Sequence, residues 1–126
     1  MFTNEFRQII HPRIPQLAII GYAESLSNIV SSEMKSLWLA HFLDGNIEVP
    51  SIRKMEKEVK LWEENMKQYG GTYFWKSCIA NCGIWYHDQL CRDIKCNPRR
   101  KNGFFAEWFQ PYGRADYVGL TRKEQF

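Results

Sequence analysis

The stretch Gln16-Leu17-Ala18-Ile19-Ile20-Gly21-Tyr22 (residues 16–22) joins an uninterrupted apolar run to a glycine stop. A short continuous apolar run bounded by turn residues is typical of a strand that is buried on both faces of a sheet. A polar segment, residues 23–28, follows it and leads into an amphipathic helical pattern. In open α/β folds, ligands bind beyond the carboxyl ends of such strands. We therefore predict one buried strand whose end approaches a ligand crevice.

The rest of the chain favours helices over further strands. A stiff lead-in with two prolines, residues 11–15, delivers the chain into the strand. Beyond it, apolar residues recur at spacings of three and four, and this periodicity predicts helices over residues 31–44, 51–69 and 87–95, the first capped by Ser31 or Ser32 and stopped by Gly45. A lone strand cannot pair its own backbone N–H and C=O groups. The fold class expected is thus α/β, as an α-rich piece of a larger protein with one buried strand followed by helices.

Composition excludes several classes of protein. Hydrophobic residues make up 44% of the 126 residues, so the chain has enough apolar side chains for a core. The formal net charge of +3 is too small to indicate nucleic acid as a partner, and the basic residues between positions 92 and 101 are interpreted as a solubilising helix end. No apolar run approaches the roughly 20 residues of a transmembrane segment, and no signal peptide is visible. We expect a cytoplasmic protein with free thiols.

A cysteine-rich segment offers an alternative from another class. The pattern Cys78-x3-Cys82-x4-His87-x3-Cys91-x4-Cys96 is close to the ligand spacing of a zinc knuckle. Apolar residues separate the candidate ligands, however, where a zinc knuckle has glycine turns and polar linkers. Small buried cysteines on apolar elements are common and inert. Our expectation is no metal, and the alternative is a small non-catalytic zinc-binding or protein-interaction module.

Two absent motifs limit what the chain can do alone. It contains neither Gly-x-Gly-x-x-Gly nor Gly-x-x-x-x-Gly-Lys-[Ser/Thr], so a dinucleotide or triphosphate lacks the glycine-rich turn that it needs. No histidine has a nucleophile beside it that would suggest a triad. We therefore predict no catalytic residue in this chain.

Short motifs follow one another in a definite order from residue 11 to residue 113. They are His11-Pro12-x-Ile14-Pro15-Gln16-Leu17-Ala18-Ile19-Ile20-Gly21-Tyr22, Ser32-Glu33-Met34 with Trp38, Phe42-Leu43-x-Gly45, Pro50-Ser51, Trp85-Tyr86-x-Asp88-Gln89-Leu90-Cys91, Asn97-Pro98-x-Arg100-Lys101, Gly103-Phe104-Phe105-Ala106-Glu107 and Pro111-Tyr112-Gly113. In this order and spacing the sequence resembles the C-terminal part of plant flavin-containing monooxygenases. The resemblance covers roughly Phe6 to Leu120.

The resemblance implies a fragment of a flavoprotein with two dinucleotide-binding domains. Residues 1–50 would form the closing strand, loop and helix of the FAD-binding domain, and residues 51–126 a C-terminal helical region. The parent would use FAD, NADPH and O2 to oxygenate a soft nitrogen or sulfur of a small-molecule substrate. Its glycine motifs would lie in missing N-terminal domains, so we expect the chain alone to be inactive and to bind neither cofactor. The implied cofactor-binding residues here are Gly21, Ser25, Ser27 and Asn28.

Overall fold

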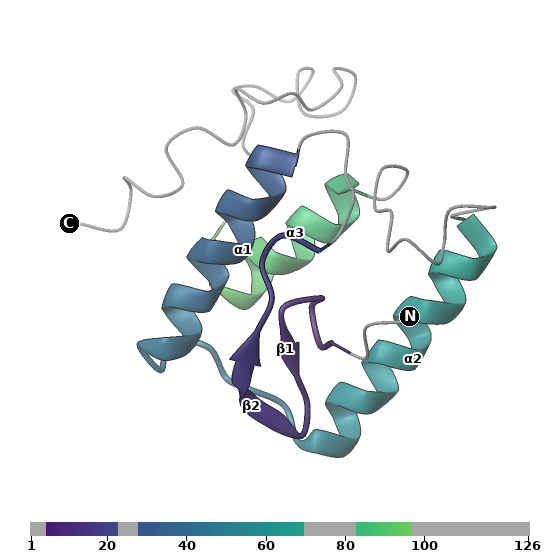
Figure 1. Ribbon diagram of the computed structural model, residues 1–126, viewed down its shortest axis with the longest axis horizontal. Coiled ribbons are helices and arrows are strands. Elements are labelled where there is room, and N and C mark those ends of the chain that lie inside the picture. The colour runs from purple at the N-terminus through teal and green to yellow at the C-terminus, as the bar shows by residue number, and fades with distance from the viewer. Residues whose placement is uncertain (1–4, 23–27, 70–82, 97–126) are drawn as a thin grey trace.

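The chain forms a small antiparallel sheet followed by three helices. A computed structural model describes residues 5–22, 28–69 and 83–96 (Figure 1). The elements are β1 (Ile10–His11), β2 (Ile14–Ala18), α1 (Asn28–Leu43), α2 (Ile52–Tyr69) and α3 (Gly83–Asp93). In Figure 1, β1 and β2 lie between the α1–α3 pair and α2. The expected α-rich α/β class, with strand before helices, is confirmed.

The sheet supplies β2 with one partner that the sequence did not reveal. The lead-in spans the end of β1, the turn and the start of β2, and β1 pairs antiparallel with β2 in the register Ile10↔Ala18 and His11↔Ile14. Beyond β2, the Ile19 N–H donates to the Ile9 carbonyl at 2.8 Å. β2 begins two residues before the predicted strand and differs in burial, because Leu17 is 46% exposed. With one neighbouring strand and one covered face, β2 buries only part of its apolar run.

Helix α1 ends as predicted but begins earlier. Its first residue is Asn28, so Ser31 is inside the helix and buried, not at its cap. At the other end Gly45 has φ 74°, a left-handed conformation that glycine adopts without a Cβ clash. The Asn46 N–H bonds the His41 carbonyl at 2.9 Å and the Gly45 N–H bonds the Phe42 carbonyl at 3.1 Å. These two bonds form a Schellman motif, which ends the helix.

Helix α3 begins at Gly83, four residues before the predicted start at residue 87. It ends on the same Schellman motif, but with a lysine where helix α1 has a glycine. The Cys96 N–H bonds the Cys91 carbonyl at 2.8 Å and the Lys95 N–H bonds the Arg92 carbonyl at 3.0 Å. Lys95 occupies the left-handed position, with φ 60°. A residue with a Cβ has a higher free energy in this left-handed conformation because of steric clash, whereas glycine does not.

Replacing Lys95 with glycine is therefore expected to stabilise the chain by about 1 kcal/mol. Lys95 is exposed, so the change removes no core contact. Urea unfolding followed by tryptophan fluorescence measures the difference, with Lys95→Ala as the matched control, because alanine also lacks the long side chain but keeps the Cβ. If both variants have the same free energy of unfolding, backbone strain at Lys95 is not the cause.

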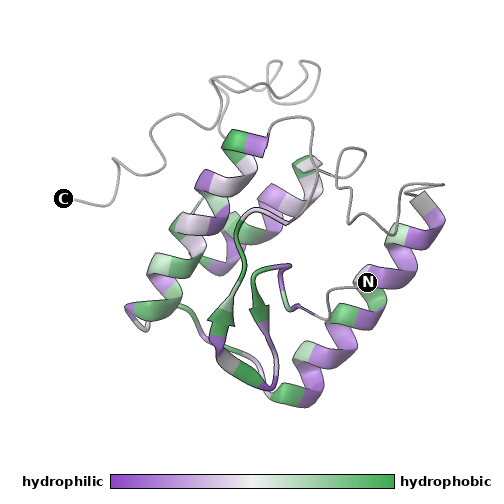
Figure 2. Ribbon diagram, viewed as in Figure 1, coloured by the Kyte–Doolittle hydropathy of each residue, from purple (hydrophilic) through white to green (hydrophobic). Residues whose placement is uncertain are grey.

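One hydrophobic core joins all of these elements. Its buried members come from the segment before β2, from all three helices and from their flanks: Phe6, Ile9, Ile10, Met34, Trp38, Ile47, Met55, Met66, Tyr86, Leu90, Cys91 and Ile94. Trp38 is fully buried and stacks on Phe42, with ring centroids 5.6 Å apart. Figure 2 shows the strands as mostly hydrophobic and α2 as mostly hydrophilic, with only scattered apolar positions. Among the described helices, none is both long and apolar enough to cross a membrane.

Candidate functional site

The predicted cofactor-facing edge follows β2. After Ala18 the chain runs through Ile19 and Ile20 toward the N-terminal end of α1 (Figure 1). Ile20 packs against the core, while Gly21 and Tyr22 are exposed. Among the described residues, no atom lies within 4 Å of a Cβ built on Gly21, and the φ of Gly21 is outside the left-handed region. Neither space nor backbone conformation within this chain therefore requires glycine at position 21.

The other predicted contacts are placed only in part. Asn28 is the first residue of α1 and is exposed, across the loop from Gly21. Ser25 and Ser27 lie outside the described residues. The structure thus places Gly21 and Asn28 on either side of the predicted loop. Their contact with a flavin stays a prediction.

The zinc alternative receives no support from the described residues. The Ser31 hydroxyl and the His87 Nε2 lie 2.9 Å apart in the buried contact between α1 and α3. Cys91 is buried in the core next to this contact, and neither Cys91 nor Cys96 forms a disulfide. Among the residues that the structure describes, no three His, Cys, Asp or Glu side chains are grouped to hold a metal ion. Cys78 and Cys82 lie outside that part of the chain.

The segment before β1 carries an arginine that connects three helices. The Arg7 Nε lies 2.6 Å from Asp93 Oδ2 on α3, and its Nη1 lies 2.9 Å from Glu58 Oε2 on α2. The Trp38 Nε1–H of α1 donates to the same Asp93 oxygen at 2.9 Å. A carboxylate that accepts several charge-assisted bonds is held in one orientation. Asp93 is consequently the residue on which α1, α3 and the N-terminal segment converge.

The backbone at this arginine is strained and specifically held. Arg7 and Gln8 have φ values of 56° and 52°, a region that non-glycine residues seldom adopt. The Tyr86 hydroxyl donates to the Arg7 carbonyl at 2.7 Å. Strained backbone of this kind persists where its surroundings determine it and is concentrated at functional sites. This segment is therefore a candidate for function as well as for structure.

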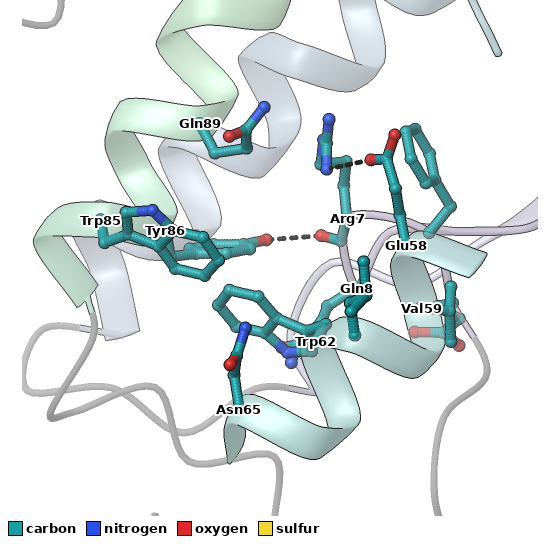
Figure 3. Close-up of a pocket in the computed structure, with 12 residues that line it drawn as sticks. Arg7, Gln8, Glu58, Val59, Trp62, Asn65, Trp85, Tyr86 and Gln89 are labelled. Carbon is teal, nitrogen blue, oxygen red and sulfur yellow. Dashed lines mark hydrogen bonds and ion pairs between the residues drawn. The ribbon is translucent and has the colours of Figure 1, made fainter. Parts of the chain in front are cut away.

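A cavity adjoins the strained segment (Figure 3). It has a volume of about 370 Å³ and is bounded by the N-terminal segment, α2 and α3. Trp62 of α2 stacks on Trp85 of α3, with ring centroids 4.9 Å apart, and is tilted against Tyr86 at 5.5 Å. The sequence did not predict this site, because its residues come from three separate segments, 5–8, 58–65 and 85–89. The spacing of Trp62, Trp85 and Tyr86 along the sequence gave no sign that they would meet.

Buried charges lie next to the cavity. Lys35 is 1% exposed, and burial lowers its pKa to about 8, with the Glu5 carboxylate opposing the shift. Burial also raises the pKa of Glu5, while Lys35 and His11 oppose it. The Lys35 ammonium donates to the Gln8 carbonyl at 3.3 Å. The opposite charges of Glu5 and Lys35 thus partly balance each other.

Comparisons with known proteins agree on one family. The family model for flavin-binding monooxygenase-like proteins matches residues 4–107. The chain is 37% identical over 120 residues to the probable flavin-containing monooxygenase 1 of Arabidopsis thaliana, covering 94% of this chain and 22% of that protein. It is 29% identical over 121 residues to the FAD-dependent monooxygenase DEP4 of Alternaria brassicicola, covering 91% of this chain and 21% of that one. No solved structure matches. The chain spans about a fifth of the length of these relatives.

Proposed function

We propose a function for this chain from one premise that the comparisons establish: the chain belongs to the flavin-binding monooxygenase-like family. Our proposal is that it is a C-terminal fragment of an FAD- and NADPH-dependent monooxygenase that oxygenates a soft nitrogen or sulfur of a small molecule. The supporting observation is the match over residues 4–107 in a chain that covers only 22% of a relative. When bound, the flavin supplies the redox and oxygen chemistry. The polypeptide positions it and excludes water.

Within that parent, we assign residues 1–50 to the closing part of the FAD-binding domain and residues 51–126 to the helical C-terminal region. The fit at the predicted edge favours this assignment, because the open space beside Gly21 leaves room for a flat ring to approach the backbone. Ser25, Ser27 and Asn28 would then supply polar contacts from the following loop and the start of α1. Missing N-terminal domains would complete the sheet beside the half-exposed β2. The cytoplasm, a reducing compartment, suits Cys91 and Cys96, which form no disulfide.

The proposal predicts that the isolated chain binds neither FAD nor NADPH tightly and has no monooxygenase activity. The reason is that backbone N–H groups at glycine-rich helix starts hold a dinucleotide pyrophosphate, and this chain has no such motif. Isothermal titration with each cofactor measures the affinity. As a positive control, this chain replaces the matching fifth of the Arabidopsis relative. The resulting chimera is expected to purify with bound flavin, detected by its absorbance. A micromolar FAD complex of the isolated chain, or a folded chimera without flavin, would contradict the proposal.

A further inference from the structure

Three residues that line the cavity of Figure 3 carry buried polar atoms without a hydrogen-bond partner among the described residues. These atoms are Glu5 Oε2, Gln8 Oε1 and Trp62 Nε1. Glu5 and Gln8 are only 7% and 5% exposed. A buried polar group without a partner has lost its hydrogen bonds to water without replacing them, which is unfavourable. Three such atoms around one cavity indicate a place where a ligand recovers that cost.

The two acceptors are close in sequence and of compatible chemistry. A carboxylate oxygen of Glu5 and an amide oxygen of Gln8 both require hydrogen-bond donors. The terminal carboxylate and amide groups turn about broad, nearly two-fold torsions, so their oxygens are free to reorient toward a ligand. The Trp62 N–H, which has no partner among the described residues, is available to donate to one acceptor on the same ligand. A ligand that complements this site therefore carries a group with several N–H donors.

The charges around the cavity favour a cation. Of its charged lining residues, Glu5 and Glu58 are acidic and Arg7 is basic. The Arg7 guanidinium is already engaged by Asp93 and Glu58. When Asp93, which pairs with Arg7, and Lys35 behind the wall are included, three carboxylates (Glu5, Glu58 and Asp93) face two cations (Arg7 and Lys35). Negative charge is thus in excess, and it is centred on Glu5, whose Oε2 has no partner.

The shape of the wall favours a flat cation over a compact one. Trp62 and Trp85 stack with an interplanar angle of 5°, and Trp85 is 46% exposed, so an aromatic surface remains open at the cavity. Planar amidinium and guanidinium groups stack on aromatic faces and are weakly hydrated, whereas an ammonium is a strongly hydrated point charge. The volume of about 370 Å³ lies at the small end of ligand sites.

We propose that this cavity binds a small flat cation, an amidinium or guanidinium attached to an aromatic or other apolar body. Its N–H groups donate to Glu5 and Gln8, and its apolar body packs against Trp62 and Trp85. This ligand site is separate from the flavin-facing edge after β2. The proposal therefore stands or fails independently of the monooxygenase assignment.

The test compares benzamidine with benzamide, which has nearly the same shape but no charge. Binding to the 126-residue chain is measured by tryptophan fluorescence and by ligand-observed NMR. We expect a benzamidine Kd on the order of 1 mM and binding of benzamide at least about tenfold weaker, since a charge-assisted bond is lost. Equal binding of the two probes, or no benzamidine binding up to about 10 mM, would overturn the proposal.

Matched variants locate the site. Glu5→Gln keeps the shape of the side chain and is expected to weaken benzamidine about tenfold or more. Glu56→Gln is the control, because Glu56 pairs with Arg13 at 2.6 Å outside this cavity. Trp85→Ala changes a half-exposed residue, tests the stacking surface without relying on Glu5, and is expected to weaken both probes. Unchanged benzamidine affinity in folded Glu5→Gln or Trp85→Ala, or an equal loss in Glu56→Gln, would contradict the assignment.

Discussion

Replacing Asp93 with alanine is expected to lower the free energy of unfolding by about 3 kcal/mol. Asp93 accepts bonds from Arg7 at 2.6 Å and 3.2 Å and from the Trp38 indole at 2.9 Å. The side chains of Arg7 and Asp93 are 15% and 14% exposed, so solvent replaces these bonds only in part. Alanine would leave a mostly buried guanidinium with Glu58 alone and a buried indole N–H with no acceptor. Unpaired buried groups of this kind carry the largest single-residue penalties.

Urea unfolding of the chain, monitored by tryptophan fluorescence, measures this loss. Glu56→Ala is the matched control, because its ion pair with Arg13 is at the surface, with side chains 35% and 68% exposed. Exposed pairs contribute about 0–1 kcal/mol, so this variant should remain close to the original stability. Similar effects of the two substitutions would show that Asp93 does not hold the helices together.

Local patterns in the sequence identified the helices but not how they pack. The apolar spacing before Gly45 predicted α1, and Gly45 ends it as expected. The sequence predicts Ser31 or Ser32 as the cap because serine favours caps, but Ser31 lies inside the helix and faces His87 of α3 in the core. That pairing joins residues 56 positions apart. The residue at which a helix starts depends on such tertiary contacts, and residue propensities alone do not predict those contacts.

The two candidate sites, the end of β2 and the junction at Arg7, also differ in whether a local sequence pattern revealed them. The end of β2 was identified from a local pattern, an apolar run that stops at Gly21, and the structure places this residue on an exposed edge. The junction at Arg7 was missed, since Arg7 and Asp93 are 86 positions apart and Arg7 lies in a segment without periodicity. Two residues in the left-handed region, Arg7 and Gln8, are set by the Tyr86 bond rather than by residue type. A single sequence carries no signal for contacts of this range.

Gly21→Val is expected to lower flavin occupancy severalfold in the chimera with the Arabidopsis relative, while Lys57→Val leaves it unchanged. In the proposed assignment, Gly21 follows β2 at the edge that faces the flavin, and its lack of a Cβ permits close approach of a ligand. Lys57 is exposed on α2 and serves as the matched control, since it receives the same new side chain. Flavin absorbance relative to protein absorbance, measured on folded and purified proteins, gives the occupancy.

The isolated chain separates a cofactor role of Gly21 from a structural one. In the part of the chain that the structure describes, no atom lies within 4 Å of a Cβ at this position, and the backbone there is not left-handed, so valine should fit without strain. The free energy of unfolding of the isolated Gly21→Val chain is therefore expected to stay within about 0.5 kcal/mol of the original. A flavin loss in the chimera without a stability loss in the isolated chain requires that the obstructed partner lies outside these 126 residues. Equal flavin content in the valine variants at positions 21 and 57 would rule out a cofactor contact at Gly21.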